Sequence, residues 1–201
     1  LEAELISGDW RGGVRADVIE ERLVRDKGHE IKAVCVVHNE TSTGATSKVG
    51  DVRAAIDNAK HPALYLVDTI SGLGSADYRH DEWGVDVTVA GSQKGLMLPP
   101  GLGFNAVSKK AIEASKTAKS VRSYWDWSGQ LANNPTGNFP YTPATNLLYA
   151  ELAQGGALMQ AASDAIGFTW LVNTLANGLA FLFFTSAPPS EGLARLSFTI
   201  F

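Results

Sequence analysis

Two side chains of the sequence have types and surroundings that suggest chemistry, Lys94 and Asp68. Lys94 stands in the stretch AGSQKGL, directly after the strand-forming residues VDVTVA and among small residues, where a long amine has no evident structural role. Asp68 ends the apolar run LYLVD. A carboxylate at the edge of a hydrophobic strand is costly unless a cation or hydrogen-bond donors meet it. The lysine amine could form a Schiff base with a carbonyl compound.

Three polar segments follow three predicted strands. They are HNETSTG (38–44), DTIS (68–71) and SQK (92–94). In an open parallel sheet, ligands gather beyond the carboxyl ends of the strands, so these segments are expected at one edge. An enzyme that uses pyridoxal phosphate needs a carboxylate to hold a proton on the ring nitrogen and a lysine for the Schiff base. Asp68 and Lys94 could fill these two roles, although Asp68 could instead only cap the next turn.

The elements that position these residues follow from hydrophobic patterning. Four short apolar runs, AVCVV, ALYLV, DVTVA and GLGFNAV, lie between residues 33 and 107 and predict buried strands of a mainly parallel sheet. Between the first two, SKVGDVRAAIDNAK has helical spacing with Ser47 as the expected cap, and Ser108 opens a second helix with solvated lysines. Residues 124–149 are rich in aromatics, Pro, Asn and Gly, which predicts an ordered but irregular crossing.

Composition limits the class of protein. The chain has 201 residues, 45% of them hydrophobic and 19% charged, which suffices for one sizeable core. A net charge of −4 gives no basic footprint for nucleic acid. The single cysteine, Cys35, excludes an intrachain disulfide and is expected to be a small buried hydrophobe. The histidines lack metal-ligand spacing, so no metal is expected.

The last fifty residues differ from the rest in their lack of charge. Between Glu151 and Glu191 the only charged residue is Asp164. The uncharged run 165–187 could by its length just span a bilayer. Two asparagines and two glycines within it weigh against a membrane span. A buried helix or an exposed apolar tail fits the pattern as well.

The motifs around Lys94 resemble a known family. The stretch VDTISGLGSADYRHDEWGVDVTVAGSQKGLMLPPGLGF closely resembles the cofactor-lysine region of class V aminotransferases, in particular the serine–glyoxylate and alanine–glyoxylate aminotransferases. HNETSTG upstream and YTPATNLLY downstream match the same family in the same order. The resemblance runs from about Trp10 to Tyr149.

The resemblance implies a fold, a cofactor and a set of site residues. The fold would be α/β, the mainly parallel sheet of the large domain of a fold-type I transferase, here incomplete. The cofactor would be pyridoxal 5′-phosphate, with Lys94 as the Schiff-base lysine and Asp68 paired to the ring nitrogen. Gln93 and Thr41 would contact the phosphate and the ring oxygen side. Thr142 corresponds to a threonine that reaches the phosphate of the neighbouring subunit, which implies a homodimer with shared sites.

The activity that the resemblance implies is transamination between small acids. The amino group of L-serine, or of L-alanine, would move to glyoxylate, giving glycine and hydroxypyruvate, or pyruvate. HNETSTG, RHDEWGVDV and FPYTPATNLLY read more like the serine–glyoxylate branch.

Two features of the family are not found in this sequence. One is a Ser-Gly loop that cradles the phosphate, and the other is a C-terminal arginine that binds the substrate carboxylate. We therefore expect residues 1–150 to be part of the cofactor-binding large domain and residues 151–201 to be an apolar tail of unclear origin. Such a fragment is expected to be inactive alone.

The sequence leaves two alternative functions to consider. In cysteine desulfurases the lysine usually follows a histidine and a mobile cysteine is needed, whereas here Gln93 precedes the lysine and Cys35 lies in a predicted strand. A non-catalytic remnant that binds a membrane or a partner through its apolar tail stays open. No targeting signal is visible, so the expected location is the cytoplasm of a bacterium, or the peroxisome if the source is a plant.

Overall fold

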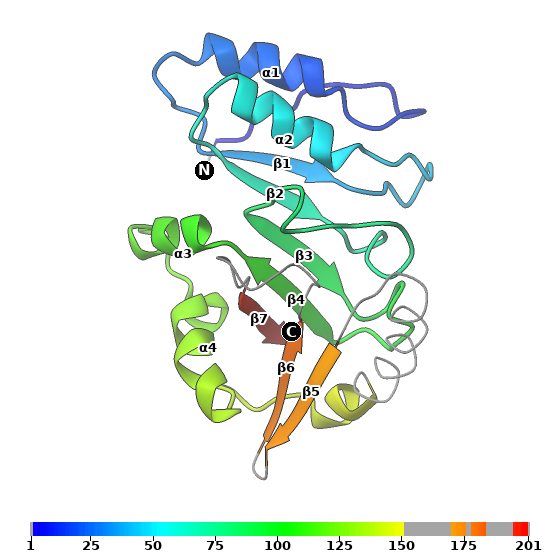
Figure 1. The fold of residues 1–201 in the computed structure, drawn as a ribbon, viewed down its shortest axis with the longest axis vertical. Coiled ribbons are helices and arrows are strands. Elements are labelled where there is room, and N and C mark those ends of the chain that lie inside the picture. The colour runs from blue at the N-terminus through cyan, green and yellow to red at the C-terminus, as the bar shows by residue number, and fades with distance from the viewer. Residues whose placement is uncertain (1, 151–169, 176–177, 184–194, 201) are drawn as a thin grey trace.

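The computed structural model describes residues 2–150, 170–175, 178–183 and 195–200. A five-stranded sheet has the order β1-β2-β3-β4-β7, and β5 pairs with β6 in a separate hairpin (Figure 1). The strands are β1 (Ala33–Val37), β2 (Leu64–Asp68), β3 (Val87–Gly91), β4 (Leu102–Val107), β5 (Trp170–Leu175), β6 (Gly178–Phe183) and β7 (Arg195–Ile200). The helices are α1 (Ala16–Arg25), α2 (Val49–Asn58), α3 (Lys109–Lys116) and α4 (Trp127–Asn133), with 3-10 turns η1 (Ser123–Trp125) and η2 (Asn134–Thr136).

The pairing of the strands confirms the predicted α/β class and refines it. β1, β2 and β3 run parallel, with Val37 beside Asp68 and Asp68 beside Val89. β4 is antiparallel to β3, because the short connection 92–101 reverses the chain at once and leaves no room for a crossover helix. The end of β3 and the start of β4 therefore lie at the same edge as the ends of β1 and β2.

The main core lies between α1, α2 and one face of the sheet. Figure 1 shows the two helices side by side next to β1 and β2. Val52 and Ile56 of α2 have no exposed surface, and Tyr65 of β2 is equally buried. The helical spacing seen in the sequence is confirmed, since this apolar face of α2 packs on alternate residues of the strands.

The two predicted helix caps have different outcomes. Ser108 is confirmed as a cap, because its hydroxyl accepts the Ala111 N–H at 3.1 Å. Ser47 is not a cap: α2 begins after Lys48, and the Ser47 hydroxyl accepts the N–H of Val14 at 3.3 Å. The Ser47 hydroxyl thus bonds to a residue 33 positions away and not to an N–H of the helix that follows it.

The segment 124–149 is more regular than its composition predicts. It contains the end of η1, then α4 and η2, and residues 145–150 are helical. The prediction of an irregular crossing is wrong because tertiary packing overrides local preference. Trp127 packs against the cluster of Val87, Val107 and Ala111, and the Asp126 carboxylate accepts the Ser128 N–H at 3.0 Å at the start of α4.

Cys35 is exposed, so the prediction that it is buried is wrong. Along β1, Val36 faces the core under α1 and α2, whereas Ala33, Cys35 and Val37 are exposed. In the part of the chain that the structure describes, the core forms on only one face of β1. β1 is thus apolar on both faces, but only one of its faces is covered.

The apolar run 165–187 falls partly within the described residues, where it forms strands rather than a helix. β5 and β6 pair antiparallel, and farther along the chain β7 pairs antiparallel with β4. Residues 151–169, 176–177 and 184–194 lie outside the described part. Within that part, no helix is both long enough and apolar enough to cross a bilayer. The division into residues 1–150 and 151–201 stays a prediction.

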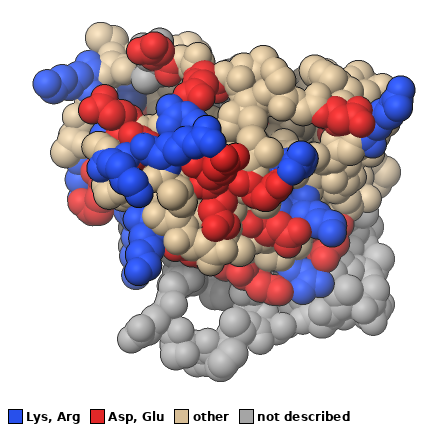
Figure 2. All heavy atoms as spheres, turned by 90° about the horizontal axis from the view of Figure 1, so that it is seen from above, with Lys and Arg blue, Asp and Glu red and all other residues tan. Residues whose placement is uncertain are grey.

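Charged side chains of both signs are interspersed on the face shown in Figure 2. Ion pairs of the described residues include Arg22 with Glu4 at 2.8 Å and Arg53 with Asp57 at 2.5 Å. Such pairs contribute little to stability, because solvent screens the two charges. This face therefore lacks a patch of a single sign.

Asp86 links two strands to α3 at the edge opposite the strand ends. Its carboxylate is 7% exposed and accepts the Tyr65 N–H at 2.9 Å, the Ser108 hydroxyl at 2.7 Å and the Lys110 ammonium at 3.4 Å. The Asp86 N–H donates in turn to the Tyr65 carbonyl at 2.8 Å. One carboxylate therefore accepts hydrogen bonds from β2, from the residue that caps α3 and from a lysine within α3.

Asp86→Ala is expected to lower the free energy of unfolding by about 2–4 kcal/mol, because the buried Tyr65 N–H and the Ser108 hydroxyl lose their acceptor. Urea unfolding followed by circular dichroism measures this. Asp81→Ala, which changes an exposed carboxylate of the same type, should stay within about 0.5 kcal/mol. Equal effects of the two variants would contradict the proposed role of Asp86.

Candidate functional site

Hydrogen bonds bring the ends of β1, β2 and β3 together at one edge of the sheet. The His38 N–H donates to the Asp68 carbonyl at 2.9 Å. The Thr69 N–H donates to the Val89 carbonyl at 2.8 Å, and the Thr69 hydroxyl donates to the same oxygen at 3.0 Å. The three polar segments that the sequence places after the strands therefore meet at this edge.

Asp68 has an exposed side chain at the end of β2. Its Oδ1 accepts the Ile70 N–H at 2.8 Å, which is the turn-capping role considered from the sequence. Among the described residues, Asp68 takes part in no ion pair. The carboxylate thus holds its own turn and keeps acceptor capacity for a further donor.

Lys94 is exposed in the loop 92–101 between β3 and β4. Its carbonyl accepts the Met97 N–H at 2.8 Å, so the lysine opens a tight turn. No ion pair within the described residues involves its amine. Gln93 is also exposed, and its amide lies over Gly91, where a Cβ would stand 2.9 Å from Oε1. Both side chains are thus free to meet a ligand.

Two glycines allow the Lys94 loop to pack on the turn that follows Asp68. A Cβ on Gly95 would lie 2.2 Å from the Leu73 carbonyl oxygen and 2.6 Å from the Ser75 hydroxyl. Gly74 has a φ of +74°, a conformation that L side chains rarely adopt, and it lies against Gly95. The two loops therefore meet backbone against backbone, which fixes the segments of Lys94 and Asp68 relative to each other.

Thr41 and Ser71 are hydrogen-bonded through their hydroxyl groups. This contact joins the segment after β1 to the segment after β2. Thr41 was predicted as a site residue from the sequence resemblance, and Ser71 was not. The signal that could have found Ser71 is its place in DTIS, at the same strand end as Asp68.

Thr142 is exposed and lies apart from the strand ends in sequence. Among the described residues it makes no hydrogen bond to Thr41, Asp68 or Lys94. Its segment is nevertheless anchored near them, because the residues around it share one apolar cluster with residues of both site loops. That cluster comprises Leu73, Ala90, Leu96, Leu102, Phe104, Phe139, Ala144, Leu147 and Leu148. The role of Thr142 across a subunit boundary stays a prediction.

The groups at the strand ends match the chemistry of pyridoxal phosphate. This cofactor needs a carboxylate at its pyridine nitrogen, an amine at its aldehyde group and polar side chains at its other oxygens. Asp68 and Lys94 offer the first two without competing ion pairs, and the hydroxyls of Thr41 and Ser71 and the amide of Gln93 offer the third. These five residues could hold the cofactor.

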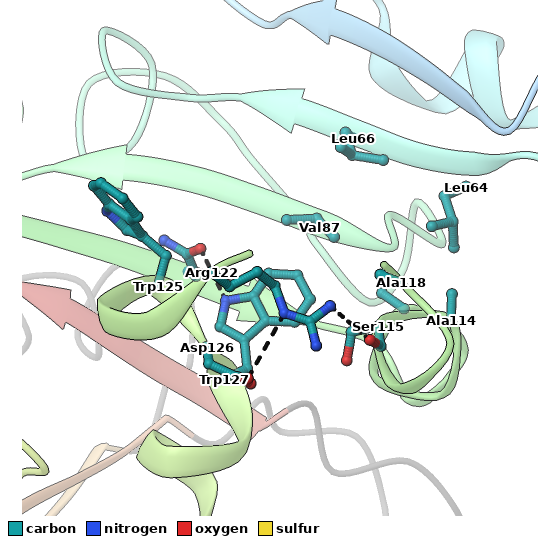
Figure 3. Close-up of a pocket in the computed structure, with 12 residues that line it drawn as sticks. Leu64, Leu66, Val87, Ala114, Ser115, Ala118, Arg122, Trp125, Asp126 and Trp127 are labelled. Carbon is teal, nitrogen blue, oxygen red and sulfur yellow. Dashed lines mark hydrogen bonds and ion pairs between the residues drawn. The ribbon is translucent and has the colours of Figure 1, made fainter. Parts of the chain in front are cut away.

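The apolar pocket in Figure 3 is a different site. It has a volume of about 550 Å³ and lies between the sheet, α3 and the segment 122–127. Leu64, at the start of β2, lines it, whereas Asp68 ends the same strand. The polar groups beside it pair with each other, with Arg122 Nε 3.7 Å from Asp126. No predicted site residue lines this pocket, and it offers no free acid or base.

A buried aromatic group supports the turn 69–75. The His38 ring is 2% exposed and contacts the rings of Tyr78 and Trp83, with centroids 5.2 and 6.3 Å away. A Cβ on Gly72 would lie 2.3 Å from His38 Nδ1, so the turn rests on the imidazole. Nδ1 has no hydrogen-bond partner among the described residues. Burial lowers the pKa of His38.

The polar groups of the same region are joined through Thr88. Its hydroxyl lies 2.6 Å from the Tyr78 hydroxyl and 2.6 Å from His80 Nδ1. Burial lowers the pKa of His80 and raises the pKa of Tyr78. The positively charged, doubly protonated form of both imidazoles is therefore disfavoured while the chain is folded.

Comparison with known sequences points to one family. The sequence profile of the class-V aminotransferases matches residues 9–124. The serine–glyoxylate aminotransferase of Methylorubrum extorquens is 55% identical over 154 residues, which cover 74% of this chain and 38% of the relative. That of Arabidopsis thaliana is 44% identical over 177 residues, covering 88% and 42%. The chain thus spans about two-fifths of the length of these curated relatives.

Solved structures agree on the fold. The alanine–glyoxylate aminotransferase from Nostoc sp. superposes with a TM-score of 0.64 at 25% identity, covering 84% of this chain and 49% of that one. The ureidoglycine–glyoxylate aminotransferase from Bacillus subtilis gives a TM-score of 0.65 at 23% identity, covering 83% and 47%. The α/β arrangement described above is the one found in these enzymes.

The lowered pKa values of His38 and His80 predict a pH-dependent stability. The unfolded chain binds these protons near the ordinary pKa of about 6.5, so the contribution is fully present above that pH and is lost as the pH falls below it. Urea unfolding from about pH 7.5 to about pH 5.5 should show a falling free energy of unfolding. His38→Gln should make this dependence shallower.

Tyr78→Phe is the control, because it removes one hydrogen bond of the same region, between the hydroxyls of Tyr78 and Thr88, and leaves both imidazoles in place. It should lower the stability by a similar amount at every pH in this window. A His38→Gln variant with the same pH dependence as Tyr78→Phe would show that His38 does not contribute to it.

Proposed function

The chain belongs to the class-V aminotransferase family, and from this premise we propose that it carries the cofactor-binding part of an enzyme that transfers the amino group of L-serine to glyoxylate. The proposal draws on relatives named serine–glyoxylate aminotransferase at 55%, 44% and 51% identity. A relative from Paracoccus denitrificans at 49% identity is named for L-aspartate and glyoxylate. Glyoxylate is thus the shared acceptor, and serine is the donor we favour.

The observation that carries the proposal is the pairing of an exposed acid and an exposed amine at one edge. Asp68 and Lys94 lie on loops that meet at Gly74 and Gly95, and neither forms an ion pair within the described residues. Folding alone does not require an acid and an amine to stand on two loops that meet and to be left without ion pairs. A ligand that needs both groups accounts for the arrangement.

Bound pyridoxal phosphate supplies an aldehyde that can take up an amino group and a ring that can accept electrons. Asp68, as a carboxylate, would hold a proton on the ring nitrogen and so keep the ring electron-poor. Lys94 would hold the cofactor covalently through its amine. Once an amino acid displaces it, the same amine would accept and return the proton that moves during transfer.

The remaining site residues would orient the cofactor. The hydroxyls of Thr41 and Ser71 and the amide of Gln93 can bind its oxygens, because each can donate a hydrogen bond. Thr142 would bind the phosphate in a second copy of the chain, so we propose that the full enzyme is a homodimer. Serine would leave as hydroxypyruvate, and glyoxylate would leave as glycine.

Lys94→Ala is expected to abolish covalent capture of pyridoxal phosphate, because Lys94 is the lysine of the loop that packs on the turn after Asp68. The protein is mixed with the cofactor and reduced with borohydride, and the labelled peptide is identified by mass spectrometry. Lys119→Ala, at another exposed lysine, should leave the label in place. A label on a different lysine, or none on the unmutated protein, would contradict the proposed function.

Asp68→Asn tests the role of the carboxylate without disturbing its turn. Asparagine keeps the oxygen that accepts the Ile70 N–H but removes the negative charge. Loss of a charged hydrogen bond should weaken cofactor binding roughly tenfold to a hundredfold. Absorbance titration with the cofactor measures this, and unfolding free energies close to those of the unmutated protein would show that the turn is intact. Unchanged affinity would exclude a ring-nitrogen contact.

A further inference from the structure

Ser92 is the first residue after β3 and has no exposed surface. Its N–H donates to the Leu102 carbonyl at 3.1 Å, and its carbonyl accepts the Leu98 N–H at 3.0 Å. Its hydroxyl donates to the Pro99 carbonyl at 2.7 Å and accepts the Leu102 N–H at 3.3 Å. One residue therefore closes the base of the loop 92–101 through both its backbone and its side chain.

The hydroxyl is needed because of the prolines on the far side of the loop. Pro99 and Pro100 have no N–H, so the ladder between β3 and β4 cannot continue through them. The Leu102 N–H and the Pro99 carbonyl therefore need hydrogen-bond partners from outside the ladder. A serine hydroxyl can donate one bond and accept another, so it satisfies both. Alanine would satisfy neither.

The closed loop base fixes the backbone at Lys94, two residues farther on. The Lys94 carbonyl accepts the Met97 N–H at 2.8 Å, and Met97 has a φ of +57°. The bond from Leu98 to the Ser92 carbonyl encloses this turn. On its outer side, Gly95 rests on the Leu73 carbonyl. The lysine backbone is thus held between the loop base and the turn that follows Asp68.

We propose that Ser92 is a positioning residue for Lys94: it holds the loop so that the amine stands at the strand ends together with Asp68. Ser92 itself is buried and bonds to the loop and to Leu102 at the start of β4. The inference rests on the proposed function, in which the Lys94 amine attacks the cofactor aldehyde. In that step a carbon–nitrogen double bond forms, the aldehyde oxygen leaves as water, and no oxidant or reductant is needed.

The test measures covalent binding of pyridoxal phosphate rather than turnover. Ser92→Ala is expected to weaken formation of the Lys94 adduct roughly tenfold or more, because small displacements of a reacting group have effects of this size. Absorbance titration gives the affinity, and borohydride trapping gives the labelled fraction of the Lys94 peptide. Ser92→Thr, which keeps the hydroxyl, should restore most of the binding.

Ser108→Ala is the matched control for a purely structural effect. Ser108 also makes two side-chain hydrogen bonds, to Asp86 and from Ala111, but at the opposite edge of the sheet. It should lower the free energy of unfolding about as much as Ser92→Ala and leave adduct formation unchanged. The contrast between the two serines therefore separates positioning from stability.

Each outcome decides the matter. If Ser92→Ala binds the cofactor as well as Ser108→Ala does, Ser92 does not position the lysine. If Ser92→Ala fails to fold, Ser92→Cys replaces it, since a thiol has a similar size and forms weaker hydrogen bonds; full binding by that variant overturns the proposal. If the unmutated protein forms no adduct at Lys94, the proposed function fails first, and this result is separate from any effect of Ser92.

Discussion

The parallel pairing of β1, β2 and β3 is the constraint on which the rest of the structure depends. Because the strands run in one direction, the residues that follow them leave the sheet at one edge. The bonds from His38 to the Asp68 carbonyl and from Thr69 to the Val89 carbonyl continue this pairing just beyond the strands. The backbone pairing therefore fixes the places of the polar segments, and the hydroxyl bond between Thr41 and Ser71 adds a link between two of them.

The edge shows a division between groups that hold the structure and groups that stay available. Thr69 and Ser92 are fully buried, and their hydroxyls donate to backbone carbonyls, that of Val89 in β3 and that of Pro99 in the loop 92–101. Asp68, Gln93 and Lys94 are exposed on top of these loops. The hydrogen bonds of the buried polar residues thus order the loops, and the exposed polar side chains remain available to bind a ligand. Removing a buried hydroxyl would shift the loop backbone and so displace the exposed side chains.

Much of this arrangement could be predicted from the sequence. The apolar runs indicated the strands, and the helical spacing of Val52 and Ile56 indicated α2. The places of Asp68 and Lys94 at strand ends followed from counting along these elements. Each of these predictions relies on neighbours within a few residues, for which local pattern is informative.

The features that could not be predicted depend on contacts between distant residues. Ser47 bonds to Val14 instead of capping its helix, and Trp127 orders a segment that composition describes as irregular. The exposure of Cys35 depends on what covers the second face of β1. The role of Ser92 could not be predicted from its neighbours in the sequence, because it arises only when β4 pairs with β3.

The position of β1 at the end of the strand order has a consequence for how the chain behaves in concentrated solution. Its outer backbone groups have no strand beside them in the described sheet, and Val37 is 41% exposed on its open face. Such an edge is a template on which other extended segments add, whereas a net charge of −4 opposes association. The resistance of the chain to aggregation therefore depends on whether this edge is shielded.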